Sequence, residues 1–257
     1  MKTKFMLLIA LTAIFTTKIC SAQSGLIEAR LDLGYGFTSG PGSRADVSGS
    51  TYTDVPYSMG MGFNVALSGT YFFGDHLGAG LDLNAVAGTE TKFTENDGAD
   101  QITEKMKGDL FSITPFLVLS AHNSGINPYG RFGIVIGAPT ATISETAAGP
   151  FAPTGTYILT ASGNIAVGVY GAFGVEYPLN DNLALNLEIF DRSLQWEPAQ
   201  VENTQAYDGD PKDKTITYST KVTNMSPTNQ VASYSTVYSP FSSVGIKVGI
   251  TMKFGAQ

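Results

Sequence analysis

The sequence predicts an all-β fold, an eight-stranded antiparallel up-and-down transmembrane β-barrel. Near the carboxyl terminus one strand face is wholly apolar, with Val244, Ile246, Val248, Ile250, Met252 and Phe254. The opposite face carries Ser243, Gly245, Lys247, Gly249, Thr251 and Lys253. A period of two is typical of a strand, and the same alternation recurs in seven earlier segments. No later segment is long and apolar enough for a membrane helix, so a closed sheet is the structure that would cross a bilayer.

The amino terminus reads as an export signal. Lys2 and Lys4 precede an apolar run, 5–15, that is too short for a membrane helix, and the small-residue site 20–22 follows. We expect cleavage after Ala22, which leaves one barrel domain over residues 23–257. The mature chain then has 12 basic and 22 acidic residues, a net charge of −10, and no cysteine. This composition excludes disulfides and a thiolate nucleophile, and it argues against a nucleic-acid partner.

The first four strands are expected at about residues 27–37, 59–71, 77–85 and 111–121. In the first, Glu28, Arg30 and Asp32 alternate with apolar residues, a pattern that fits a polar lumen better than a soluble core. The second is expected to place Met59 and its alternate neighbours outward. Pro115 falls on the outward row of the fourth strand and can be accommodated only at a bulge or a point of weak pairing.

The last four strands are expected at about residues 129–136, 165–177, 183–192 and 243–254. Short turns precede the third, fifth and seventh strands, and long polar connections alternate with them. The longest loop, about 197–240, contains an alternating stretch at 215–220 in which neither face is apolar. We therefore expect that stretch to form a hairpin extension above the membrane rather than two further spanning strands.

This layout indicates a barrel of the Gram-negative outer membrane. In such barrels the turns are short on the periplasmic side and longer outside, and an even strand count leaves both termini in the periplasm. Aromatic girdles are expected at both ends. The candidates at the short-turn end are Tyr71, Phe73, Tyr129, Tyr177 and Phe254. Those at the loop end are Tyr35, Phe37, Tyr57 and Trp196.

Three segments resemble the small outer-membrane barrel family typified by the OmpA transmembrane domain and OmpX. The final strand resembles the family's carboxyl-terminal assembly signal, through Lys247, Gly249, Met252 and Phe254, and 128–133 and 174–179 look like its fifth and sixth strands. The resemblance implies a monomer that contacts outer-membrane lipid and lipopolysaccharide and the outer-membrane assembly machinery. Two departures are that residues 255–257 follow the terminal aromatic and that no peptidoglycan-binding domain follows.

The lumen is expected to hold a balanced network of charges. The acidic members are Glu28, Asp32, Asp82, Glu176 and Glu188, and the basic members are Arg30, Arg131, Arg192, Lys247 and Lys253. Because the first and last strands must be neighbours, Glu28 is predicted to lie near Lys253 and Asp32 near Lys247. Unpaired buried charges are costly, and an eight-stranded barrel is only wide enough for side chains to fill. We therefore predict a filled lumen rather than a wide pore, and a structural, porin-like or surface-exposed role.

Catalysis is not expected. Some small outer-membrane barrels modify lipids, which needs a nucleophile and a nearby base at the outer leaflet. His76 and His122 are the only histidines, and both fall at short turns on the periplasmic side. Two isolated histidines without clustered carboxylates do not make a metal site, and no cofactor is expected.

Two other roles remain open. The last loop is rich in serine and threonine, with tyrosines at Tyr207, Tyr218, Tyr234 and Tyr238, which suits an adhesin that binds an extracellular ligand. A channel for small hydrophobic solutes, as in OmpW-like barrels, would need an apolar inner lining near the loop end. Its candidates are Phe72, Leu110, Phe116, Val118, Tyr170 and Phe190. A soluble lipocalin-like barrel is the rival fold, with its apolar face turned inward.

Overall fold

The structure is a computed structural model. It describes residues 25–40, 42–48, 51–96, 100–122, 125–150, 152, 155–205, 215–217 and 239–255. The expected export signal, 1–22, and the four loop tyrosines at 207, 218, 234 and 238 lie outside the described residues.

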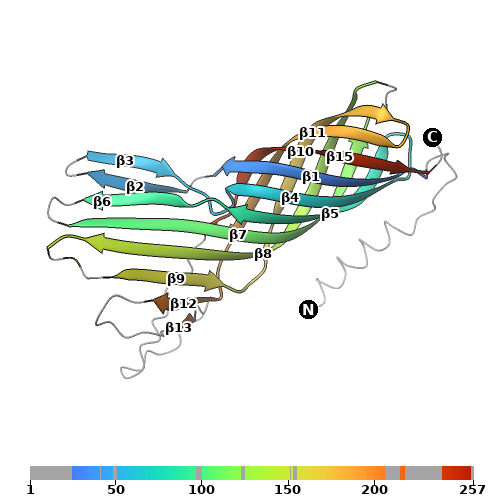
Figure 1. The fold of residues 1–257 in the computed structure, drawn as a ribbon. Coiled ribbons are helices and arrows are strands. Elements are labelled where there is room, and N and C mark those ends of the chain that lie inside the picture. Colours follow the sequence, from blue (N-terminus) through green and yellow to red (C-terminus); the bar gives the residue numbers. More distant parts are fainter. Residues whose placement is uncertain are drawn as a thin grey trace.

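Eight antiparallel strands close into a barrel (Figure 1). They are β1 (Ile27–Thr38), β4 (Gly62–Phe72), β5 (Leu77–Gly88), β7 (Gln101–Ser120), β8 (Asn127–Ala148), β10 (Ala166–Asn180), β11 (Leu183–Trp196) and β15 (Ser243–Phe254). Each strand pairs with the next along the ring in that order, and β15 pairs with β1 to complete it. The predicted fold is therefore confirmed, including the neighbouring first and last strands.

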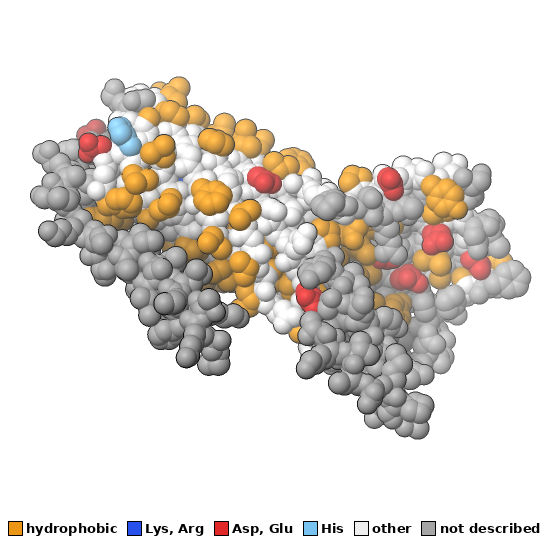
Figure 2. Space-filling model, turned by 180° about the vertical axis from the view of Figure 1, so that it is seen from behind, with side chains coloured by type: hydrophobic (Ala, Val, Ile, Leu, Met, Phe, Trp, Pro, Cys, Tyr) orange, Lys and Arg blue, Asp and Glu red, His pale blue; other side chains and the backbone are white. Residues whose placement is uncertain are grey.

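The strand faces have the polarity of a membrane barrel. In β4 buried and exposed residues alternate strictly, and the exposed ones are apolar, with Leu67 54% exposed and Phe63 67% exposed. Apolar residues occupy most outward positions of the other barrel strands as well, up to Phe173 on β10, which is 81% exposed. Figure 2 shows hydrophobic side chains spread over the outer wall of the barrel. Burial of such a surface in hydrocarbon is favourable, whereas contact with water is not.

Pro115 lies at a local gap in the pairing of two barrel strands. It pairs with Leu81 of β5 on one side. On the other side, the pairing of β7 with β8 passes from Ile113 to Phe116 without a change of register and skips the two residues between them. A proline has no N–H to donate to a ladder, so pairing is weak at this point, as predicted.

Beyond the barrel, the sheet continues on one side only (Figure 1). β7 and β8 are 20 and 22 residues long, and the parts of them that lie beyond the loop end of the barrel pair with shorter strands outside the ring. β6 (Thr91–Asn96) pairs with β7, and β2 (Ser43–Ser48) and β3 (Thr51–Pro56) follow beyond it. On the other side β9 (Thr156–Ser162) pairs with β8, and β12 (Gln200–Gln205) and β13 (Thr215–Thr217) follow. We call this open sheet the extension. A last short strand, β14 (Ser239–Pro240), pairs with the end of β11.

The extension occupies segments that the sequence predicts as loops. The stretch at 215–217 pairs with β12 outside the barrel, as expected of a non-spanning segment. The other strands escape sequence reasoning because each is only six or seven residues long, too short to carry the long apolar row that marks a spanning strand.

Several aromatic residues predicted for the girdles point elsewhere. Trp196 is 1% exposed and Tyr129 is 4% exposed, and both face the lumen. Trp196 shares the parity of the inward residues of β11, and Tyr129 shares that of Arg131. Tyr57 packs edge-to-face on Phe93 of β6, with ring centroids 5.6 Å apart.

Met59, also predicted outward, is 6% exposed, because it precedes the first residue of β4 and does not follow that strand's alternation. The girdle positions that the structure places outward are Phe37, Tyr71, Phe73, Tyr177 and Phe254, and Tyr35, which is partly buried against Phe37 and Phe63 on the outer wall.

Candidate functional site

Glycines on the inward face make room for the side chains that fill the lumen. A methyl group added at Gly245 of β15 would lie 2.7 Å from the ring of Phe190 and 2.2 Å from the backbone oxygen of Tyr35. At Gly249, two pairs further along, it would lie 2.1 Å from a carboxylate oxygen of Asp32. Large and charged residues therefore occupy the lumen where the neighbouring wall is reduced to backbone.

Glu188 is the centre of the charged layer. Its carboxylate is 0% exposed and accepts hydrogen bonds from Tyr170 Oη at 2.5 Å, Tyr129 Oη at 3.1 Å and Arg131 Nε at 2.8 Å. A second nitrogen of Arg131 also donates to it. Lys247 Nζ lies 3.9 Å from Glu188 and donates to Tyr170 Oη at 3.1 Å. Residues from four strands are thus joined across the lumen.

A second layer lies toward the short-turn end. Arg30 donates to Glu176, and its guanidinium lies 4.1 Å from the centre of the Tyr129 ring. Lys253 Nζ lies 3.0 Å from Glu176 and 3.5 Å from Glu28. Buried charges that are paired and hydrogen-bonded in this way avoid most of the cost of an isolated charge.

The structure places the ten predicted lumen charges on the inside of the ring, nine of them buried and Lys253 partly exposed. Glu28 does lie near Lys253, as expected. Asp32 also lies near Lys247, as expected, because the register places them one inward position apart on the paired strands β1 and β15, with Asp32 opposite Gly249 and Lys247 opposite Gly34. Their ion pairs within 4 Å are with other strands: Lys247 Nζ lies 3.9 Å from Asp82 on β5, and Asp32 lies 3.9 Å from Arg131 on β8. Long side chains extend across the narrow lumen and so pass beyond their strand neighbours.

Arg192 has no acidic partner within 4 Å among the described residues. Its guanidinium instead donates to the backbone oxygen of Gly60 at 3.2 Å and to Ser243 Oγ at 2.8 Å. It therefore holds the segment before β4 against the start of β15, at the loop end of the lumen.

Two chain segments close the loop end of the lumen. Phe241 is fully buried and packs edge-to-face on Trp196, with ring centroids 5.5 Å apart. Ser58 Oγ donates to the backbone oxygen of Ser242 at 2.5 Å, and Met59 N donates to that of Pro240 at 2.9 Å. The segment before β4 and the segment before β15 are therefore hydrogen-bonded over the opening.

The six candidates for an apolar channel lining are all buried but do not line one path. Leu110, Tyr170 and Phe190 belong to the apolar cluster at the loop end. Phe72, Phe116 and Val118 form a separate cluster with Tyr129, so their expected placement near the loop end is wrong. Both clusters border the charged layers, since Tyr170 of the first and Tyr129 of the second donate to Glu188. These residues act as packing around the charges.

One wall of the lumen, formed by β1, β4 and β5, carries shorter polar side chains. Asp32, Asn64, Asp82 and Asn84 each have a buried side-chain oxygen that has no hydrogen-bond partner among the described residues. Such oxygens can accept hydrogen bonds from single water molecules. The lumen is thus polar as well as filled.

The two histidines brace neighbouring turns at the short-turn end. His76 Nδ1 lies 3.0 Å from the backbone oxygen of Ser120, and His122 Nδ1 bonds to that of Asp75. Their rings stack with centroids 6.4 Å apart.

Among the described residues no three histidine, cysteine, aspartate or glutamate side chains gather as metal ligands. No helix in that part of the chain is long and apolar enough to span a membrane.

Sequence reasoning missed Tyr129 as a lumen residue, the hydrogen bond of Tyr170 to Glu188 and the loop-end closure. Tyr129 shares the inward parity of Arg131, a signal that could have assigned it to the lumen, whereas the sequence predicts Tyr170 inward but only as apolar lining. Phe241 lies between strands, where parity gives no direction.

An apolar outer wall around a filled, polar lumen defines an integral membrane β-barrel with its own internal packing.

The chain belongs to the outer membrane protein beta-barrel domain family, whose model matches residues 7–223. It is an outer-membrane protein, and in such barrels the short turns face the periplasm. No curated protein matches the sequence.

Three solved structures are similar. OprG from Pseudomonas aeruginosa is 14% identical, with 92% of this chain and 99% of that chain covered and a TM-score of 0.47. Ail of Yersinia pestis is 14% identical, with 90% of this chain and 99% of that chain covered and a TM-score of 0.34. CarO of Acinetobacter baumannii is 14% identical, with 88% of this chain and 97% of that chain covered and a TM-score of 0.38. The family and these three proteins carry no enzyme name.

Proposed function

We propose that this protein is a surface-binding protein, in which a closed barrel anchors an extracellular recognition sheet. The observation that carries the proposal is the continuation of β7 and β8 beyond the ring into the extension. Rigid scaffolds commonly present binding surfaces on the segments that connect their strands. Here those segments are themselves paired strands, so the surface is ordered before a ligand arrives.

Transport is disfavoured by the contents of the lumen. The charged layer around Glu188 fills the middle of the barrel, and the layer around Glu176 fills its short-turn end. Phe241 and Trp196 close the loop end. A barrel of eight strands has room for side chains and little else. No catalytic group is part of the proposal.

The outward face of the extension is rich in hydroxyl groups in register. Thr94, Thr103, Thr146 and Thr156 lie opposite one another in a single row across β6, β7, β8 and β9. Thr146 Oγ1 and Thr156 Oγ1 are 3.5 Å apart. Short hydroxyl side chains supply adaptable hydrogen bonds at little entropic cost, which suits a polar ligand such as a carbohydrate or a polar protein surface.

A binding assay with matched variants tests this proposal. The purified protein in nanodiscs would be applied to an array of host glycans and matrix proteins, together with a Thr146→Glu/Thr156→Glu variant and an Asp181→Asn control at a periplasmic turn. We expect a signal that the double variant loses and the control keeps. Equal binding by both variants, or no signal from any form, would overturn the proposal.

We further propose that residues 1–22 direct export and are removed. We also propose that Lys247, Gly249, Met252 and Phe254 form the signal read by the outer-membrane assembly machinery, on the pattern of the last strand. Phe254 ends β15 and is 50% exposed on the outer wall. Amino-terminal sequencing of the mature protein should start at Gln23. A Phe254→Ala variant should accumulate unassembled, whereas normal assembly would contradict the second proposal.

A further inference from the structure

The positive charges outside the lumen gather on the outward face of the extension. Among the lysine and arginine side chains that the structure describes, five point into the lumen, and the others are Lys92 on β6 and Lys105 and Lys107 on β7. Phe93 and Met106, the next residues along the two strands, are buried on the inward face, so the lysines point outward. Such a group of cations, on a mature chain with an expected net charge of −10, attracts anions to one place.

The lysines form a compact group by the register of the strands. Lys92 lies directly opposite Lys105, and Lys107 is the next residue of β7 on the same face. Like charges directly opposite on neighbouring strands are destabilising. An anionic group held between Lys92 and Lys105 would relieve this repulsion.

Two carboxylates compensate the lysines from the barrel side only. Lys105 Nζ lies 2.9 Å from Glu90, and Lys107 Nζ lies 3.5 Å from Asp109. Both pairs are about half exposed, and ion pairs of that kind contribute little. Lys92 has no ion-pair partner among the described residues. The group therefore keeps an excess of positive charge on the side that faces away from the barrel.

On that side the lysines border a row of four threonine hydroxyls, here called the hydroxyl row, formed by Thr94, Thr103, Thr146 and Thr156. The first two of these threonines are the next outward residues after Lys92 and Lys105 on their strands. Ser144 on β8 lies opposite Lys105 and adds a hydroxyl to the row of the lysines. Successive outward residues of a strand are about 7 Å apart, so the ammonium groups and the hydroxyls belong to one continuous surface.

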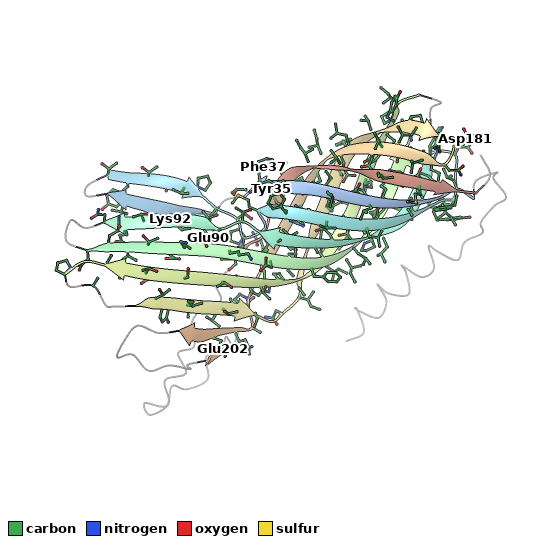
Figure 3. All side chains as sticks on the ribbon, in the orientation of Figure 1. Tyr35, Phe37, Glu90, Lys92, Asp181 and Glu202 are labelled. Atoms are coloured by element: carbon green, nitrogen blue, oxygen red, sulfur yellow. The ribbon has the colours of Figure 1, made fainter. Side chains whose placement is uncertain are left out.

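This surface stands clear of the lipid. On β7 the outward apolar row ends at Phe111, and Lys105 lies about 20 Å further along the strand. The rings of Tyr35 and Phe37 pack edge to face at the loop end of the barrel, with centroids 5.1 Å apart, and aromatic belts of this kind mark the membrane boundary. Figure 3 shows Lys92 on the extension, beyond the barrel end that carries the two aromatic residues. A ligand that reaches the lysines therefore comes from the extracellular medium.

We propose that the extension recognises a soluble acidic polysaccharide, whose uronate carboxylates bind Lys92 and Lys105 while its hydroxyl groups bond to the hydroxyl row. This inference rests on the recognition role proposed above and names the class of its ligand. A carboxylate between two ammonium groups gains charge-assisted hydrogen bonds, which are stronger than those between neutral groups. Neighbouring strands lie about 4.8 Å apart, so a row across four strands is about 14 Å long and meets several successive sugars.

Binding of uronate polymers to the protein in nanodiscs tests the ligand class. The probes are polygalacturonate, alginate and hyaluronan, each beside its carboxyl-methyl ester, which keeps the sugars and removes the charge. The test variant is Lys92→Gln/Lys105→Gln, and Lys92→Arg/Lys105→Arg keeps the charge at the same positions. The control is Lys212→Gln/Lys214→Gln, which changes the net charge equally at other positions. Heat-modifiable migration on gels establishes that every form is folded.

We expect the wild type to bind at least one of the three polymers and its ester about tenfold to a hundredfold more weakly, because charge-assisted hydrogen bonds are lost. The glutamine variant should lose binding of the polymer by the same factor, whereas the arginine variant and the control should bind like the wild type. The inference is overturned if none of the polymers binds, if the esters bind equally, or if the glutamine variant and the control behave alike. Tighter binding of dextran sulfate than of every uronate polymer would overturn the assignment to carboxylates.

The two proposals fail in different ways. If the Thr146→Glu/Thr156→Glu variant loses a neutral ligand on the glycan array and the Lys92→Gln/Lys105→Gln variant keeps it, the recognition role stands and the acidic ligand is wrong. If neither variant changes any binding signal, both proposals are wrong.

Discussion

Substitution of Glu188 by glutamine should destabilise the barrel strongly. The carboxylate is fully buried and accepts bonds from Tyr129, Tyr170 and Arg131. Glutamine keeps the volume but removes the charge that compensates Arg131 and, at 3.9 Å, Lys247. Removing one partner of a buried ion pair costs about 3–5 kcal/mol. The equilibrium constant for unfolding should therefore rise by roughly 150- to 4,000-fold, since about 1.4 kcal/mol corresponds to a factor of ten.

The measurement is reversible urea unfolding of the protein in lipid vesicles, followed by tryptophan fluorescence. Asp191→Asn is the matched control, because Asp191 also loses a carboxylate on β11 but lies on the exposed outer face. It should change the unfolding free energy by less than about 0.5 kcal/mol. A loss below about 1 kcal/mol for Glu188→Gln, with an unchanged slope against urea, would refute the idea that this carboxylate holds the network together.

Three further predictions concern the packing of the lumen. Gly245→Ala should lower the free energy of unfolding by about 1–3 kcal/mol or more, because the added methyl group meets the Phe190 ring and backbone atoms. Gly171→Ala, where the methyl group has open space, should leave the free energy of unfolding unchanged. Equal effects of the two substitutions would contradict the packing described. The single tryptophan, Trp196, should resist quenching both by brominated lipids and by acrylamide, and lipid quenching would place it on the outer wall instead. Phe241→Ala should leave bilayer currents unchanged because the charged layers remain, and new stable openings would show that the loop-end closure alone blocks the lumen.

The spanning strands are predictable from sequence because their environment imposes a period of two. Lipid on one side and a polar lumen on the other leave no freedom in how Leu31 and Asp32, or Ile246 and Lys247, are directed. Outside the band the outward residues no longer meet lipid and need not be apolar, and only single inward residues such as Phe93 and Ala161 join the apolar cluster. The strands at 91–96 and 156–162 therefore read as loops.

The membership of the charged network is predictable for the same reason, but its pairings are not. The contact of Glu28 with Lys253 joins neighbouring strands, which topology alone implies. Arg30 reaches Glu176 from β1 to β10, across strands that do not pair. Such contacts depend on the tilt of the strands and on side-chain length, and neither is written in the alternation.

Planar-bilayer recording of the purified monomer tests the closed barrel most directly. With Glu188 and Arg131 joined in the middle and Phe241 and Trp196 packed at the loop end, the protein should insert without giving a large, stable conductance. Reproducible large steps of constant size from the monomer would contradict a filled lumen, and with it the role of the barrel as an anchor for the extension.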